Sequence, residues 1–512
     1  MTPAPPASPV QPPYPTQPSY PAQPPSPAHP VPETQRGNLA ANLRRIAPLA
    51  WPVFIGQVSV LAFTTVDTVL VARHAAVDLA ALAVGAAAYI TVFIGLMGVL
   101  LAISPIVGQL FGAGRLQDAG RQVHQSLWIV AALSVMGSTL LAFPAPFLAL
   151  ARASPEVAAG VRGYLWGLAL SLPAALLFTV YRGFNTAVSR PRVVMLLQLG
   201  GLAVKVPLSW LLVTGVPGLG ISPLGVVGCG IATCIAMWAQ LLVALLVIGR
   251  DPFYRPFHIL GRRLDAPCWP DIKAFLRLGV PIGASIMVEV TGFAFLALFI
   301  ARLGTTAVAG HQLVVNLVSL MFMMPLAIAS ATSTLVAQRV GADDPLDARR
   351  LAWHGLWIAT GVALLMGSSI YLARESVLGL YTDNVLILAA ALPLLSWVVV
   401  FHVADAAQTV AAFVLRAYKI AVVPMLIYIG ALWGVGLGGG YVLAFDVTGS
   451  VPAAMQGARG FWIASTVGLI LAGTALSAYL LHVLRQQGPP RPPRVGRPRQ
   501  AAQARAVPKP AG

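Results

Sequence analysis

Three acidic side chains and one lysine stand inside otherwise apolar stretches of this 512-residue chain: Asp67, Glu289, Asp405 and Lys205. A charged group at the centre of a bilayer costs about 3 kcal/mol on insertion scales, so such residues are candidates for a functional site. Glu289 and Asp405 fall in the second half of the chain, in predicted spans whose central parts hold no base. A carboxyl group in that position either holds a proton or binds a cation.

The composition requires lipid around most of the chain. Hydrophobic residues make up 57% and charged residues 10% of it, and the mean hydropathy is +0.79, whereas a soluble domain has about 25% charged residues. The predicted fold class is therefore an all-α polytopic membrane protein with twelve transmembrane helices. We place the spans at residues 46–72, 79–110, 123–150, 158–181, 193–214, 224–249, 275–301, 307–337, 352–373, 385–415, 420–445 and 459–483.

Both ends of the chain differ from this apolar core. Residues 1–37 are rich in proline and residues 487–512 in proline and arginine, so we expect two disordered tails. The other bases gather in alternate loops, which places both ends in the cytoplasm. The net charge of +17 comes from tails and loops, so we expect no nucleic-acid partner. The basic C-terminal tail either contacts anionic membrane lipid or only aids solubility.

The core repeats itself. At an offset of 229 residues, Gln109 and Gly112 align with Gln338 and Gly341. We therefore predict two six-helix lobes at residues 38–250 and 275–486, joined by a hinge-like cytoplasmic connector at residues 251–274. Six spans per half make the repeat parallel, with its pseudo-twofold axis along the membrane normal, an arrangement typical of secondary transporters. The two lobes form a complete bundle, so we expect a monomer.

Several of these residues belong to longer motifs. MVEVT stands at residues 287–291, AGHQ at residues 309–312 and ADAAQ at residues 404–408. With the twelve spans and the repeat, these motifs resemble the multidrug and toxic compound extrusion (MATE) family, and specifically its bacterial NorM branch. The resemblance covers residues 48 to about 484. It implies a transporter in a bacterial inner membrane that exports cationic amphipathic drugs or dyes in exchange for inward Na⁺ or H⁺.

The resemblance also assigns roles. It makes Glu289 and Asp405 the cation site of the second lobe, and Asp67 the carboxylate of the first. Where the family usually has two asparagines in span 5, this chain has Lys205 and Ser209. Lys205 either pairs with Asp67 and holds it ionised, or forms a proton switch with it, or extends to the membrane interface. Asp67 at a hydrated helix end is a further interpretation.

Other side chains are candidates for lining a cleft between the lobes. Phe293 lies one turn beyond Glu289 on the same face of a helix, although such side chains often serve only packing. The full predicted set is Phe293, Met287, Gln57, Gln312 and Asn316. The eight histidines have no metal-ligand spacing, so we predict no metal site beyond transient Na⁺ at Glu289 and Asp405.

Two other classes of membrane protein have different sequence requirements. A lipid-linked oligosaccharide flippase would need bases in its cleft to bind pyrophosphate, and Lys205 is the one base away from the ends of the predicted spans. An intramembrane enzyme would need clustered catalytic side chains, which the spacing does not provide. No glycine-rich phosphate-binding loop is present, so ATP is not the predicted energy source. We therefore predict neither enzymatic activity nor a cofactor, and the flippase remains the alternative.

Overall fold

The computed structural model describes residues 38–486 except residues 152, 217–219, 221 and 262–263. The predicted tails at residues 1–37 and 487–512 lie outside the described residues. Twelve helical segments of the described chain are long and apolar enough to cross a membrane. The predicted all-α class and the number of spans are thus confirmed.

The first lobe is formed by α1 to α8. Its helices are α1 (Leu39–Ala72), α2 (Ala76–Leu100), α3 (Ile103–Gly112), α4 (Leu116–Ala142), α5 (Ala145–Ala151), α6 (Pro155–Ala187), α7 (Pro191–Thr214) and α8 (Gly225–Arg250).

The second lobe follows a short 3₁₀ turn, η3 (Pro252–Phe257). Its helices are α9 (Trp269–Ala301), α10 (Thr305–Gly341), α11 (Pro345–Leu372), α12 (Arg374–Gly379), α13 (Val385–Ala391), η4 (Leu394–Trp397), α14 (Val398–Ala417), α15 (Val422–Tyr428), η5 (Ile429–Gly439), α16 (Gly440–Ala444), η6 (Ala453–Met455) and α17 (Ala458–Gln486). α9 begins inside the segment predicted as a connector.

Several spans are interrupted where the sequence weakens the helix. The third predicted span does not reach residue 150, because α4 ends at Ala142 and α5 starts after Pro144. The second is broken between α2 and α3, just before Pro105, and the tenth at Pro393. Proline has no N–H to donate, so it favours such breaks. The eleventh span contains the glycine-rich π-helix η5.

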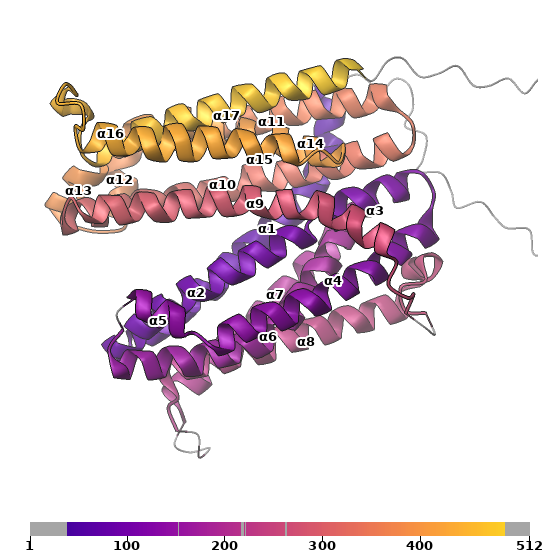
Figure 1. Cartoon of the computed structure of the whole chain (residues 1–512), viewed down its shortest axis with the longest axis horizontal. Coiled ribbons are helices and arrows are strands. Elements are labelled where there is room, and N and C mark those ends of the chain that lie inside the picture. The colour runs from indigo at the N-terminus through magenta and orange to yellow at the C-terminus, as the bar shows by residue number, and fades with distance from the viewer. Residues whose placement is uncertain (1–37, 152, 217–219, 221, 262–263, 487–512) are drawn as a thin grey trace, which may run out of the picture.

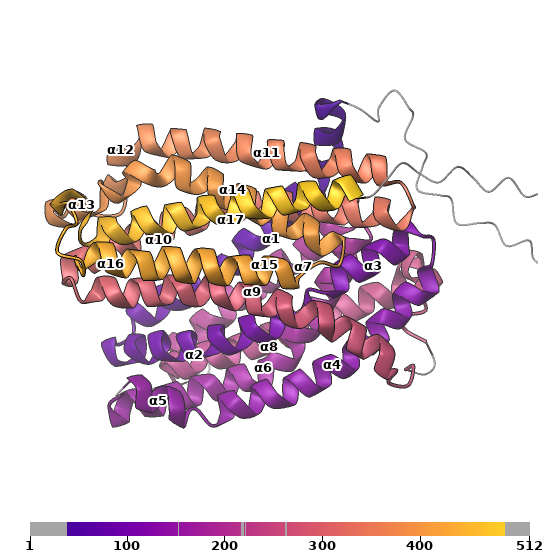
Figure 2. The same ribbon diagram turned by 45° about the horizontal axis from the view of Figure 1, so that its top comes forward.

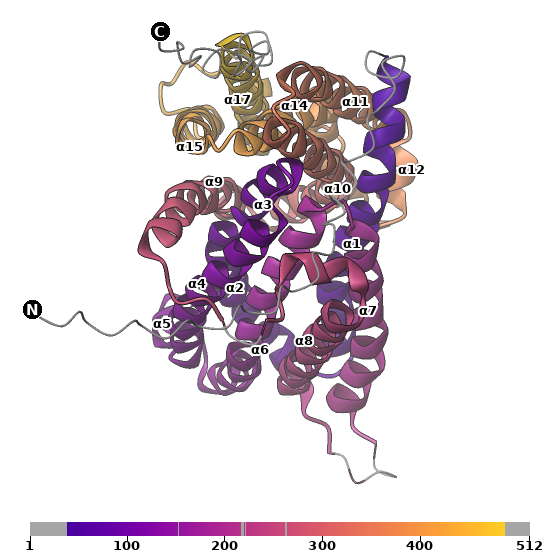
Figure 3. The same ribbon diagram turned by 90° about the vertical axis from the view of Figure 1, so that its right-hand side faces the viewer.

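The two lobes form a V. They diverge towards the end that carries α5, α12 and α13, and they meet near the opposite end, at α3 (Figure 1). α1 begins and α17 ends at that same closed end of the molecule (Figure 2). Viewed from there, α3 lies against α10 and α14 of the second lobe (Figure 3).

The crossing of α3 and α10 is a reciprocal contact of the two lobes. A Cβ atom added at Gly112 would lie 1.9 Å from the carbonyl oxygen of Gln338, and one at Gly341 would lie 1.9 Å from that of Gln109. These are the residues that align in the internal repeat. Glycine is needed at both places because the two backbones touch.

Hydrogen bonds repeat the same symmetry. The Gln109 amide donates to the carbonyl oxygen of Ala417 at 2.8 Å, and the Gln338 amide donates to that of Ala187 at 2.7 Å. Each bond joins one lobe to the other, so the closed end is held by two equivalent polar contacts.

Ion pairs add to this closure. Arg45 of α1 forms a bidentate pair with Asp347 of α11, with N–O distances of 3.1 and 2.9 Å. Arg121 of α4 lies 3.3 Å from Asp271 of α9. The first helix of each lobe thus binds the third long helix of the other.

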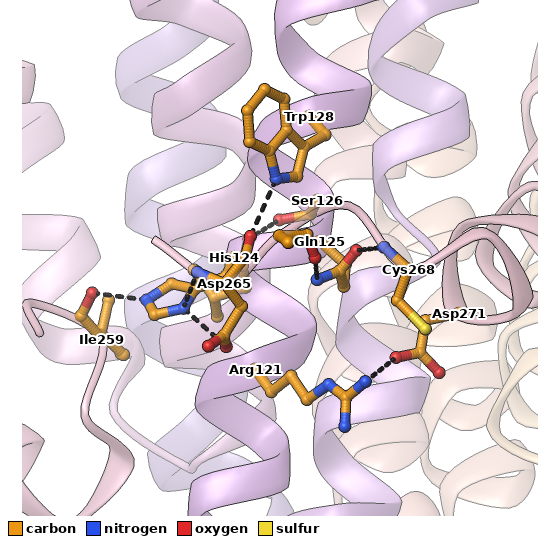
Figure 4. Close-up of polar contacts among 11 residues, drawn as sticks. Arg121, His124, Gln125, Ser126, Trp128, Ile259, Asp265, Cys268 and Asp271 are labelled. Carbon is orange, nitrogen blue, oxygen red and sulfur yellow. Dashed lines mark hydrogen bonds and ion pairs between the residues drawn. The ribbon is translucent and has the colours of Figure 1, made fainter. Parts of the chain in front are cut away.

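The described part of the predicted connector contacts the first lobe. The Tyr254 hydroxyl donates to Oδ1 of Asn185 at 2.6 Å. On α4, His124 lies 2.9 Å from the Asp265 carboxylate and 2.8 Å from the carbonyl oxygen of Ile259 (Figure 4). Buried aromatic and polar side chains thus hold the described part of this segment against the first lobe.

Candidate functional site

A cavity of about 470 Å³ lies where the two lobes face each other. Its walls come from α1, α2, α3, α6 and α7 of the first lobe and α9, α10, α14, α15 and α17 of the second. The volume falls within the roughly 300–1,000 Å³ of sites for drug-sized molecules. Most of the lining is apolar, and its charged residues in the described chain are Glu289, Asp405, Arg182 and Arg416.

Glu289 and Asp405 reach this cavity from different helices of the second lobe. On α9, Ile286, Glu289, Val290 and Phe293 line the cavity together. Their spacing of three or four residues places them on one face of the helix. Asp405 comes from α14, and the charge of Glu289 acts on it. Two carboxyl groups thus share one partly enclosed apolar space.

A short chain of hydrogen bonds orients Asp405. The Tyr428 hydroxyl donates to Oε1 of Gln408, and the Gln408 amide donates to Oδ1 of Asp405 at 2.9 Å. Because the Tyr428 proton occupies the amide oxygen, the NH₂ group of Gln408 must face the carboxyl group. Sequence reasoning did not assign these two roles, although Gln408 stands in the ADAAQ motif, one turn after Asp405.

Asp67 lies in a separate group within the first lobe. Lys205 donates to Oδ2 of Asp67 at 2.8 Å and to the carbonyl oxygen of Phe63 at 3.2 Å, and the Ser209 hydroxyl lies 3.4 Å from Oδ1. Asp67 is 4% and Lys205 2% exposed. Asp67 is therefore not at a hydrated helix end, and Lys205 does not extend to the interface. Neither residue is part of the cavity wall.

Two of the five predicted cleft residues line the cavity, and three do not. Phe293 and Gln57 line the cavity. The residues outside its lining are Met287, Gln312 and Asn316. Met287 lies on a neighbouring face of α9 and points towards α2. Its sulfur is 3.5 Å from the place where a Cβ atom would stand if Gly95 had one. The other two are exposed residues on the same side of α10 as the lining residues Ser319 and Met323, two turns nearer the start of the helix. The sequence therefore did not determine which way the Met287 side of α9 turns, or how far the cavity extends along α10.

Arg182 and Arg416 also line the cavity, contrary to our expectation. The predicted spans ended at residues 181 and 415, which assigned both bases to loops. Instead α6 continues to Ala187 and α14 to Ala417. The repeat carried a signal, since YRGFN at residues 181–185 and LRAYK at residues 415–419 place the two arginines at equivalent positions. The expectation that these two arginines lie in loops, away from the cleft, was therefore wrong.

Comparison with known proteins identifies the family. The model of the MatE family matches twice, at residues 52–211 and 281–442. The chain belongs to the MatE family. The starts of the two matches have the same spacing as the internal repeat, and the predicted family resemblance is confirmed.

Curated relatives match most of this MatE chain. It is 39% identical to the "Probable multidrug resistance protein NorM" of Aromatoleum aromaticum, over 86% of this chain and 93% of that protein. It is 34% identical to the "Multidrug resistance protein PmpM" of Pseudomonas aeruginosa, over 88% of this chain and 93% of that protein.

Solved structures share the fold of this MatE protein. The eukaryotic MATE transporter AtDTX14 has a TM-score of 0.78 at 18% identity, covering 88% of this chain and 98% of that one. A multidrug resistance MATE family transporter in an outward-facing conformation has a TM-score of 0.77 at 19% identity, covering 88% and 97%.

Proposed function

We propose that this MatE protein is a multidrug efflux antiporter that exports cationic amphipathic compounds in exchange for inward Na⁺ or H⁺. The observation that carries the proposal is the pair of carboxyl groups, Glu289 and Asp405, in the wall of a largely apolar cavity between the lobes. The names of the curated relatives support the multidrug substrate class.

In this proposal, drug and coupling cation compete for one acidic pair. An apolar wall accommodates flat hydrophobic rings, and the carboxylates bind the positive charge of the drug. An entering Na⁺ or proton neutralises the same groups and releases it. The membrane potential contributes to the driving force, since one charge moving through 100 mV releases about 2.3 kcal/mol. That free energy corresponds to a roughly 50-fold gradient.

Alternating access needs the closed end of the V to open. The α3–α10 crossing, with the two reciprocal glutamine bonds, is the contact that must break and reform. With both chain ends in the cytoplasm of a bacterial inner membrane, as the loop charges indicate, this structure corresponds to a state closed on the cytoplasmic side. Rocking of one lobe against the other then exposes the cavity inward.

The buried pair in the first lobe fits a proton switch better than a Na⁺ site. The Lys205 ammonium group already occupies the Asp67 carboxylate. Protonation of Asp67 would leave Lys205 without a counter-charge and so favour a repacked first lobe.

The two cavity arginines also keep a lipid flippase open as a second candidate. Guanidinium groups bind phosphate in a bidentate manner, and Arg182 and Arg416 reach the cavity that such a lipid would enter. Glu289 and Asp405 oppose this candidate, because carboxylates in the same wall repel a pyrophosphate group.

Ethidium efflux from proteoliposomes tests the proposal. We expect the wild type to move ethidium under a Na⁺ gradient alone or a pH gradient alone, and the effective gradient identifies the ion. Glu289→Gln and Asp405→Asn should each abolish efflux. Asp383→Asn is the matched control, because Asp383 is exposed and outside the cavity wall. A wild type that moves no ethidium under either gradient would contradict the antiporter and favour the flippase.

A further inference from the structure

Arg182 reaches the cavity from α6 without forming an ion pair to any described carboxylate. Its Nη1 lies 3.4 Å from Oε1 of Gln57, and its Nη2 lies 3.6 Å from the sulfur of Met97. Both acceptors are neutral, and a thioether sulfur is a weak one. A guanidinium group has five N–H donors, so most of its capacity to bind an anion is unused here.

Arg416 has a different environment. Its guanidinium carbon lies 4.6 Å from the centre of the Phe413 ring, and its charge acts on Glu289 of the same lobe. It is 8% exposed. Arg416 thus serves as a counter-charge within the acidic second lobe. Arg182, on the opposite wall, is the guanidinium group left for a ligand.

The cavity therefore presents two kinds of charge on opposing lobes. Glu289 and Asp405 stand on the second lobe and Arg182 on the first. A ligand that is only cationic satisfies the carboxylates but leaves Arg182 with neutral partners. A ligand that also carries a carboxylate satisfies both walls, and bidentate guanidinium–carboxylate pairs are among the strong hydrogen-bonded contacts.

We propose that Arg182 is an anion-binding residue of the cavity, and that it sets how strongly the cavity prefers a cationic ligand that also carries a carboxylate. This inference rests on the proposed efflux function for its physiological meaning. Arg182 would thus determine specificity, because the acidic pair can bind a cation without it.

Two dyes that differ in one group provide the test. Rhodamine B carries a cationic ring system and a free carboxylate, and its ethyl ester keeps the cation without the anion. Binding of each dye to the purified full-length chain is measured by fluorescence anisotropy, and efflux of each from proteoliposomes is measured separately. We expect Arg182→Gln to raise the ratio of the rhodamine B Kd to the ester Kd about tenfold.

Matched variants keep the result interpretable. Arg182→Lys retains the charge without the planar fork and should restore part of the ratio. Arg192→Gln removes an exposed arginine outside the cavity wall and should leave it unchanged. Equal weakening of both dyes by Arg182→Gln, or no weakening of either, would overturn the role of Arg182. Dye binding without gradient-driven efflux would instead contradict the antiporter and leave the binding ratio as the measure of this inference.

Discussion

The Lys205 ammonium nitrogen lies 2.8 Å from Oδ2 of Asp67, and both side chains are almost fully buried inside the first lobe. This ion pair is inside the protein, where water does not solvate the two charges. Removing one partner leaves the other charge buried and uncompensated, which typically costs about 3–5 kcal/mol. We therefore propose that the pair links the protonation of Asp67 to the packing of α1 against α7.

Replacement of the lysine should reveal that link. We expect Lys205→Asn to lower the thermal stability of the detergent-solubilised protein more than the double variant Asp67→Asn with Lys205→Asn, because the double variant removes both charges. If the pair is a proton switch, Lys205→Asn also flattens the dependence of efflux on pH. Unchanged efflux with an unchanged pH profile would rule the switch out.

The hydrogen-bond chain to Asp405 gives a second prediction. Tyr428→Phe removes the hydroxyl that fixes the Gln408 amide, without changing the size of the ring. Loss of one such bond costs about 1 kcal/mol, so efflux should fall roughly fivefold. Tyr441→Phe is the control, since Tyr441 is 36% exposed and outside the cavity wall. Equal effects of the two substitutions would show that Tyr428 does not position the acid.

The crossing of the lobes gives a third prediction. Gly112→Ala or Gly341→Ala places a methyl group 1.9 Å from a carbonyl oxygen of the opposite lobe, so α3 and α10 must separate. We expect a shift towards states open at this end, measured as a longer spin-label distance between the lobes, and slower efflux. Gly200→Ala is the control, because a Cβ there meets nothing within 4 Å. An unchanged distance distribution would show that this crossing does not hold the lobes closed.

A fourth prediction concerns Asp251, which caps η3 outside the spans. The Phe253 backbone N–H, 2.9 Å from its carboxylate, and the Arg190 guanidinium hold the pKa of Asp251 below its ordinary value. Its stabilising effect is therefore present at neutral pH and is lost as the pH falls through this lowered pKa. Asp251→Asn keeps an oxygen that can cap η3 but removes the ion pair with Arg190, so it should reduce the free energy of unfolding by about 0.5 kcal/mol at neutral pH.

The pH dependence provides the check. Thermal unfolding of wild type and Asp251→Asn should differ at pH 7; the difference should start to shrink below the ordinary aspartate pKa of about 3.9 and disappear below the lowered pKa of Asp251. A difference that persists at low pH would show that the amide disturbs packing rather than charge.

The amino-acid sequence alone determined the class of this protein, because apolar spans, loop bases and a 229-residue repeat are properties of local composition and order. It also singled out Glu289, Asp405 and Asp67, since a carboxyl group in an apolar stretch needs a reason to be there. The motifs around them were enough to predict the family. The lobe boundaries and the roles of these residues stay predictions.

Tertiary structure decided which side chains meet. The rotation and length of each helix turn Phe293 into the cavity but Met287 towards α2, and they carry Arg182 and Arg416 into the wall although hydropathy ended their spans one residue earlier. The sequence left open whether Lys205 pairs with Asp67 or extends to the membrane interface, and the packing of α1 on α7 brings it to Asp67. Hydropathy records how apolar a segment is, whereas these contacts depend on the angles and separations of helices far apart in the chain.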